Sequence, residues 1–229
     1  MRISFDVYNI GVSRNIKTNI SFSSKELLNL TSNLSQDTFE NTMTEKEKML
    51  AGFSYFAGDD ELCKDKKVAQ DLWFRYNKSH PSDEVNRKQI MKELLGKTGE
   101  EFFIEPDFKC DYGYNIEIGE RFFSNYNLVI LDTAKIKFGD DVLIGPNCSF
   151  YAASHPINPV ERKKGTLVGR PINVGNNVWI GGSVAVLGGV NIGDNVVVAA
   201  GSVVTKDLPA NTICAGCPCR PIKDIDKTM

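Results

Sequence analysis

Between Val174 and Thr205 an aliphatic residue recurs every six positions, and no other feature constrains the fold of this chain as strongly. The recurring residues are Val174, Ile180, Val186, Ile192, Val198 and Val204. A six-residue period matches neither the 3.6 residues of an α-helical turn nor the two-residue alternation of a strand. It is typical of a solenoid in which each hexapeptide forms one short face and three faces complete a coil. We expect the aliphatic side chains to point inward, and the glycine that often follows them to turn a corner with unusual φ and ψ angles.

Composition excludes several classes of protein. The chain has 229 residues, 41% hydrophobic and 24% charged, which suits one well-buried domain with appendages. A net charge of −2 favours neither nucleic acid nor an anionic membrane as a partner. No apolar run approaches the ~20 residues of a membrane span, and the first residues do not resemble a secretory signal. We therefore expect a cytoplasmic protein.

The sequence predicts three parts. Residues 1–42 contain 17 Ser, Asn or Thr, and so polar a composition buries little apolar surface. We expect these residues to be a weakly ordered extension, or the result of a gene start assigned too far upstream, with Met43 as the alternative start. Residues 43–100 are predicted to form a helical cap, with Thr44 as N-cap and Glu47 at the capping-box position. Residues 101–225 are predicted to form the solenoid, whose open end such a cap would cover.

The cap is predicted to be helical from 44 to 96. His80-Pro81-Ser82 interrupts the pattern, Ser82 is a suitable cap for a helix over 83–95, and Gly96 is a suitable stop. The apolar faces are expected to contain Met49, Leu50, Phe53, Leu62, Ala69, Leu72, Trp73 and Tyr76.

The hexapeptide pattern fails over residues 151–170, which we expect to leave the solenoid as a loop. Functional residues concentrate on loops that leave a rigid scaffold, and this one contains His155. Imidazole suits proton transfer at neutral pH, although an isolated histidine is more often an ordinary surface residue. The second histidine, His80, is better interpreted as structural.

Six motifs in a fixed order resemble the maltose and galactoside O-acetyltransferases of the hexapeptide-repeat family, over some four-fifths of the chain. They are MTEKEKMLAG (43–52), RYNKSHP (75–81), IEPDFKCDYGYNIEIG (104–119), ASHPINP (153–159), VGNNVWIGG (174–182) and AAGSVVTKDLPAN (199–211). The resemblance implies a left-handed parallel β-helix assembled as a homotrimer, with active sites between subunits, acetyl-CoA as donor and a sugar hydroxyl as acceptor.

The resemblance also implies residue roles. His155 matches the catalytic base, and a backbone amide near Gly182 matches the donor to the tetrahedral oxyanion. Asn125 matches the asparagine that contacts the acceptor and the transition state, Asp111 matches an acceptor contact, and Asp132 and Trp179 are further acceptor candidates. Without the resemblance, Asn125 would equally suit a structural ladder and Trp179 a corner of the core.

For the donor, the matching positions are Ala200, Thr205, Lys206, Arg220 and Lys223. The last two are basic residues suited to the phosphates of acetyl-CoA. Two departures concern the acceptor: acidic positions of the galactoside branch fall on Ala57 and Thr133 here, which favours the maltose or glucose-like branch.

Three alternatives share the fold. A related acyltransferase would act on an amine, a serine or an antibiotic hydroxyl, and only the acceptor pocket decides this. A γ-class carbonic anhydrase would need three histidines for zinc, and the chain has two. A non-catalytic scaffold would not need His155 in its loop. The CAGCPC segment at 214–219 lacks a second ligand pair at zinc spacing, so we expect packing cysteines and no metal.

Overall fold

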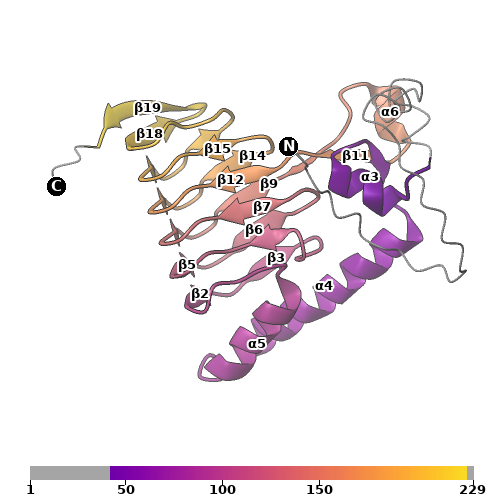
Figure 1. The fold of residues 1–229 in the computed structure, drawn as a ribbon, viewed down its shortest axis with the longest axis horizontal. Coiled ribbons are helices and arrows are strands. Elements are labelled where there is room, and N and C mark those ends of the chain that lie inside the picture. Colours follow the sequence, from indigo (N-terminus) through magenta and orange to yellow (C-terminus); the bar gives the residue numbers. More distant parts are fainter. Residues whose placement is uncertain (1–41, 226–229) are drawn as a thin grey trace, which may run out of the picture. The chain divides into compact units, whose positions relative to one another are not determined.

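The computed structural model describes residues 42–225, and the residues from Met43 onward form one compact unit. The predicted extension over 1–42 therefore lies outside the described residues, apart from Thr42. The compact unit is a left-handed parallel β-helix with helices at its N-terminal end (Figure 1). None of the helices described is long and apolar enough to cross a membrane.

The β-helix has three faces, which the chain visits in the order 2, 3, 1 along each coil. Face 1 contains β4 (Ile116–Glu117), β7 (Ile136–Phe138), β12 (Ile172–Val174) and β15 (Asn191–Ile192). Face 2 contains β2 (Phe102–Ile104), β5 (Phe122–Ser124), β8 (Leu143–Ile144), β13 (Trp179–Ile180), β16 (Val197–Val198) and β18 (Thr212–Gly216), closed by antiparallel β19 (Cys219–Asp224). Face 3 contains β3 (Phe108–Cys110), β6 (Leu128–Leu131), β9 (Ser149–Tyr151), β14 (Ala185–Leu187) and β17 (Val203–Val204).

The predicted inward ladder is confirmed. All six recurring aliphatic residues are buried, and partners three hexads apart pair in parallel, as Val174 does with Ile192 and Ile180 with Val198. We expected the glycine after each inward residue to be needed for unusual φ and ψ angles at the corner, and that reason was wrong. The left-handed corner falls two residues later, at positions such as Asn177 and Asn195. The glycine is needed because a Cβ on Gly181 would lie 2.6 Å from the Ala200 nitrogen of the next coil.

The cap contains α3 (Glu45–Ala51), α4 (Asp60–Lys78) and α5 (Glu84–Leu94). The capping box between Thr44 and Glu47 is confirmed. Asp83, not Ser82, precedes α5, because the Ser82 hydroxyl is hydrogen bonded to the His80 ring at 2.8 Å.

The predicted helix is interrupted after α3. Gly52 adopts a left-handed conformation that ends α3, and Asp59 caps α4, so the residues between leave the helix and form the short strand β1 (Tyr55–Phe56). Leu50, expected on the apolar face, is 56% exposed. Met49 is fully buried as predicted.

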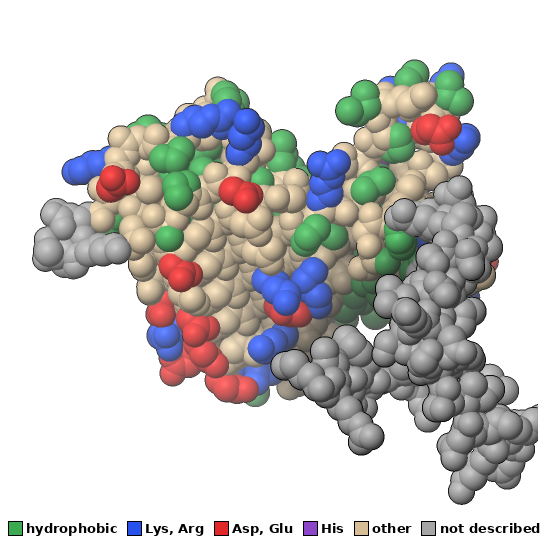
Figure 2. Space-filling model, turned by 45° about the horizontal axis from the view of Figure 1, so that its top comes forward, with side chains coloured by type: hydrophobic (Ala, Val, Ile, Leu, Met, Phe, Trp, Pro, Cys, Tyr) green, Lys and Arg blue, Asp and Glu red, His purple; other side chains and the backbone are tan. Residues whose placement is uncertain are grey.

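The predicted loop at 151–170 has its own secondary structure. It contains β10 (Ala153–Ser154), α6 (Pro159–Lys163) and β11 (Thr166–Gly169), and β10 and β11 form an antiparallel pair. We call residues 153–169 the arm. It stands out from the solenoid with apolar side chains at its tip (Figure 2), where Ile157 and Val160 are exposed. The sequence could not show that β11 also pairs with β1 of the cap.

Candidate functional site

The predicted site residues fall mainly on two edges of the β-helix, separated by the width of face 3. We call the turns after the face 3 strands the arm edge, because the arm leaves from it, and the turns after the face 2 strands the far edge. The arm edge carries Asp111, Asp132, His155, Thr205 and Lys206. The far edge carries Asn125, Gly182 and Ala200, while Trp179 projects from face 2 and Arg220 and Lys223 lie on β19.

His155 directly follows β10 and is exposed. The strand before it is held by β11, with Ser154 opposite Val168 and Ala153 opposite Gly169. The imidazole is therefore presented to solvent from an ordered strand end and not from a free loop. This arrangement leaves the ring accessible to a ligand at the arm edge.

Asp111 lies on the same edge and is paired with the cap. The Nζ atom of Lys66 in α4 lies 2.6 Å from its Oδ1 atom, and only 13% of the Asp111 side chain is exposed. A carboxylate in this position can accept hydrogen bonds from hydroxyl groups.

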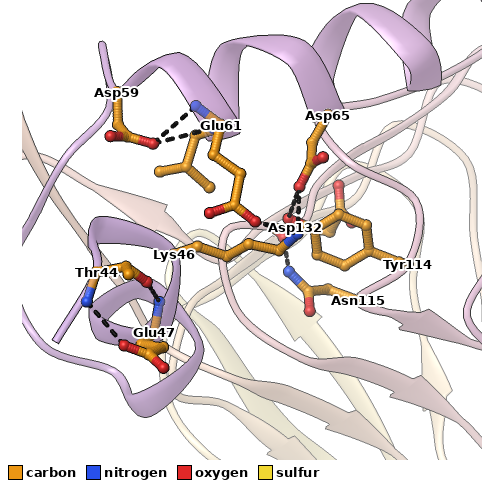
Figure 3. Close-up of polar contacts among 10 residues, drawn as sticks. Thr44, Lys46, Glu47, Asp59, Glu61, Asp65, Tyr114, Asn115 and Asp132 are labelled. Atoms are coloured by element: carbon orange, nitrogen blue, oxygen red, sulfur yellow. Dashed lines mark hydrogen bonds and ion pairs between the residues drawn. The ribbon is translucent and has the colours of Figure 1, made fainter. Parts of the chain in front are cut away.

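Asp132 supports the turn that carries Asp111. Its Oδ1 atom accepts from the backbone N–H groups of Asp111 and Tyr112 at 3.0 and 2.9 Å, and its Oδ2 atom accepts from Gly113 at 2.7 Å. The Asp132 side chain is fully buried. The Nδ2 group of Asn115 donates to the backbone carbonyl of Asp132 (Figure 3). Burial raises the pKa of Asp132 to about 6, opposed by the N–H group of Tyr112 and aided by the nearby Asp111 carboxylate.

This position differs from the sequence-based expectation for Asp132. A carboxylate that is inaccessible and already accepts three N–H groups has little capacity left for an acceptor hydroxyl. Its placement fits an indirect role, in which Asp132 holds Asp111 in position.

Two buried hydroxyl groups have no hydrogen-bond partner among the described residues, the Oη atom of Tyr55 and the Oγ1 atom of Thr133. Thr133 follows Asp132 at the arm edge, and Tyr55 belongs to β1. Burial raises the pKa of Tyr55 to about 12. The neighbouring Tyr112 and Thr133 hydroxyl groups oppose this shift, whereas the charges of Asp111 and Asp132 add to it. The hydroxyl groups of Tyr55, Tyr112 and Thr133 therefore lie close enough to influence one another, although the Tyr55 and Thr133 hydroxyls make no bond of standard hydrogen-bond geometry.

On the far edge, hydrogen bonding fixes the orientation of the Asn125 amide. Its Oδ1 atom accepts from the backbone N–H of Tyr126 at 2.7 Å, so the Nδ2 group is the part left to donate. Gly182 contributes a backbone N–H group for which the structure of residues 42–225 shows no partner. Both groups could donate to a developing negative charge.

One chain does not bring Asn125 and His155 together. Asn125 precedes the face 3 strand β6, whereas His155 follows the face 3 strand β9 and β10. At about 3.3 Å per strand residue, the width of face 3 keeps the two edges more than ~10 Å apart. A groove of about 470 Å³ beneath the first coils, lined by Arg87, Phe103, Phe123 and neighbouring residues, contains none of the predicted site residues.

The predicted donor residues are accessible. Ala200, Thr205, Lys206, Arg220 and Lys223 are all exposed towards the C-terminal end of the solenoid. In the CAGCPC segment, Cys214 and Cys219 are buried and Cys217 is exposed. Among residues 42–225, no three His, Cys, Asp or Glu side chains converge as a metal site would require.

Sequence reasoning missed Lys66 and β1. Lys66 is one of several lysines on α4, and nothing local distinguishes the one that reaches Asp111. A signal for β1 was present, since three aromatic residues, Phe53, Tyr55 and Phe56, lie between Gly52 and Gly58, and glycine breaks helices.

Comparison with known proteins places this geometry in a family. Residues 48–99 match the maltose acetyltransferase hexapeptide capping motif, and residues 171–206 match the bacterial transferase hexapeptide, with six repeats. The galactoside O-acetyltransferase of Escherichia coli strain K12 is 41% identical over 79% of this chain and 89% of its own.

Two solved structures are also similar. A maltose O-acetyltransferase from Clostridium difficile 630 has a TM-score of 0.80 and 46% identity, covering 81% of this chain and 99% of that one. A hexapeptide-repeat acetyltransferase from Vibrio cholerae, complexed with acetyl coenzyme A, has a TM-score of 0.75 and 38% identity, covering 81% and 100%.

Proposed function

The chain belongs to the hexapeptide-repeat acetyltransferases that include the maltose and galactoside O-acetyltransferases, and we propose that it transfers the acetyl group of acetyl-CoA to a hydroxyl of a maltose- or glucose-like sugar. The observation that carries this proposal is the exposed His155 at an ordered strand end, on the same edge as Asp111. An accessible imidazole on the same edge as a carboxylate that can accept hydrogen bonds from hydroxyl groups suits acetylation of a sugar.

In the proposed reaction, His155 removes the proton from the acceptor hydroxyl while the hydroxyl oxygen attacks the thioester carbonyl. The carbonyl oxygen becomes an oxyanion, which the Gly182 N–H and the Asn125 Nδ2 group stabilise. The intermediate collapses as the C–S bond breaks, and the protonated imidazole gives its proton to the departing CoA sulfur. The products are the acetyl ester and CoA, and His155 is regenerated.

The separation of Asn125 and His155 supports a site shared by two copies, and with it a homotrimer. Face 2 offers a surface for such an interface, because its outward residues form an apolar ladder in parallel register. The ladder is Phe103, Phe123, Leu143, Trp179, Val197 and Ile213, of which Trp179 is 56% exposed and Leu143 49%. The outward residues of face 1 are polar, namely Glu117, Lys137, Asn173 and Asn191. An apolar ladder of this length is normally covered by a partner.

The donor would lie along the upper coils. Ala200, Thr205 and Lys206 are accessible to the pantetheine arm, and the basic residues Arg220 and Lys223 on β19 suit the nucleotide phosphates. Trp179, exposed on face 2, would form an apolar wall of the shared site.

The acceptor assignment rests on two positions at which this chain differs from the galactoside branch. Where the galactoside branch has acidic residues, this chain has the partly buried Ala57 and the buried Thr133. Neutral groups at both positions favour a maltose- or glucose-like sugar over a galactoside.

The test is CoA release from acetyl-CoA with a panel of sugars, amines and serine, for the wild type and His155→Ala. We expect maltose or glucose to be acetylated, and the variant to lose a factor of ~10²–10⁴ in kcat. Near-full turnover of the variant would contradict the proposed base. Acetylation of amines but of no sugar would favour an acyltransferase with a non-sugar acceptor.

A further inference from the structure

A continuous hydrogen-bonded sheet joins the cap to His155. Tyr55 and Phe56 of β1 pair with Leu167 and Thr166 of β11, and the other edge of β11 pairs with β10. His155 is the next residue after β10. The cap is therefore two strands away from the proposed catalytic base, although the two are a hundred residues apart in the sequence.

Glu45 fixes the outer edge of this sheet. Its Oε2 atom accepts from the backbone N–H of Phe56 at 2.5 Å, and its Oε1 atom accepts from the Lys48 ammonium at 2.7 Å. The helix that carries Glu45 is itself fixed by the capping box of Thr44 and Glu47 (Figure 3). Glu45 thus replaces the neighbouring strand that β1 lacks on that edge.

A second small core connects the same segments. Met49, Tyr55, Leu62 and Tyr112 form a buried cluster separate from the solenoid core, and Leu167 packs against it. Tyr112 belongs to the turn that carries Asp111, whereas Leu167 belongs to β11. The cluster therefore packs against both the acceptor-side turn and the arm.

We propose that the cap is part of the catalytic apparatus, with Glu45 a positioning residue that aligns His155 through β1, β11 and β10. This inference rests on the proposed function of His155. Loss of the Glu45 contact would free one edge of the sheet and loosen the strand that precedes the imidazole. Small displacements of a catalytic group reduce the rate strongly, because the group must lie close to the reacting atom.

The test compares Glu45→Ala, Glu45→Gln and Glu61→Ala. Glu61 is a matched control, since it is also a cap carboxylate paired with a lysine, Lys46, at 3.1 Å, but it does not contact β1. We expect Glu45→Ala to lower kcat about 10-fold and to change the KM for acetyl-CoA less than about twofold. Glu45→Gln keeps an oxygen for the Phe56 N–H and should retain most of the kcat, and Glu61→Ala should match the wild type.

A double-mutant cycle separates positioning from general stability. In the His155→Ala background, Glu45→Ala should no longer lower the residual rate, because there is no imidazole left to align. If Glu45→Ala does not fold, Glu45→Asp replaces it in the same cycle, because its carboxylate is one methylene too short to reach Phe56. The effect of Glu45→Asp on the rate is then compared with and without His155.

The outcomes distinguish the two proposals. If His155→Ala is severe while the Glu45 variants are silent, or are equally harmful in both backgrounds, the positioning role is wrong and the proposed function stands. If His155→Ala itself keeps full turnover, the proposed function fails and this inference fails with it.

Discussion

The Nζ atom of Lys66 lies 2.6 Å from the Oδ1 atom of Asp111, joining the longest helix of the cap to the turn after β3. The contact brings the cap to the arm edge at a second point, independent of β1. Because the Asp111 side chain is only 13% exposed, its orientation depends on this partner as well as on the turn beneath it.

We therefore expect Lys66→Met to weaken acceptor binding. The KM for the sugar should rise several-fold, while the kcat and the KM for acetyl-CoA change little, because the proposed donor residues lie on the upper coils. Initial-rate kinetics with each substrate varied in turn check this, with Lys67→Met, an exposed neighbour on α4, as control. Equal effects of the two lysine variants would show that Lys66 has no special role.

The buried carboxyl of Asp132 should make stability depend on pH. Its pKa is about 6 in the folded chain and about 4 when unfolded. The folded state therefore holds more protons between these values, and the contribution of Asp132 to the free energy of unfolding falls as pH rises from about 4 to about 6. Asp132→Asn has no titrating carboxyl at this position. Its free energy of unfolding should therefore rise by about 3 kcal/mol relative to that of the wild type between pH 4 and pH 7. Urea unfolding at several pH values measures it, and a pH-independent difference would contradict the assignment.

Two glycines should respond differently to alanine. At Gly181 a Cβ would lie 2.6 Å from the Ala200 nitrogen, whereas at Gly201, with φ +73°, it would meet no atom within 4 Å. Gly201→Ala should cost only the left-handed backbone penalty, about 1–2 kcal/mol. Gly181→Ala should cost more, about 3 kcal/mol, because neighbouring coils must separate. Thermal unfolding of the two variants decides this, and similar losses would be inconsistent with a steric role for Gly181.

The face 2 ladder should be the contact between copies. Leu143→Arg places a charge in the middle of the ladder and should dissociate the oligomer, since an unpaired buried charge is strongly unfavourable. Asn173→Arg, on the polar face 1, should leave the oligomer intact. Sedimentation velocity distinguishes trimer from monomer, and a trimeric Leu143→Arg variant would place the interface elsewhere.

The period of six was enough to predict a solenoid with three faces per coil, because each inward residue, such as Ile180, belongs to a short-range repeat. The capping box was predictable for the same reason, since Thr44 and Glu47 are three residues apart. These features depend on local geometry, which the order of residues expresses directly.

The site was only partly accessible from the sequence. Motifs singled out His155 and Asp111 as candidates. They could not show that Asp132 is buried beneath the turn of Asp111, since that depends on how one coil stacks on the next. The pairing of β1 with β11 joins segments a hundred residues apart and has no local signal. Contacts of this kind, like that between Lys66 and Asp111, appear only once the chain is folded.

The most direct test of the account is subunit complementation between His155→Ala and Asn125→Ala, each expected to be nearly inactive alone. The two variants are co-expressed with different tags, and oligomers containing both are assayed for acetyl transfer. If the site takes Asn125 from one copy and His155 from its neighbour, one site in each mixed trimer is intact. Because a trimer has three such sites, the mixed trimers should then show about a third of the wild-type rate. Mixed oligomers as inactive as either variant alone would contradict the shared site.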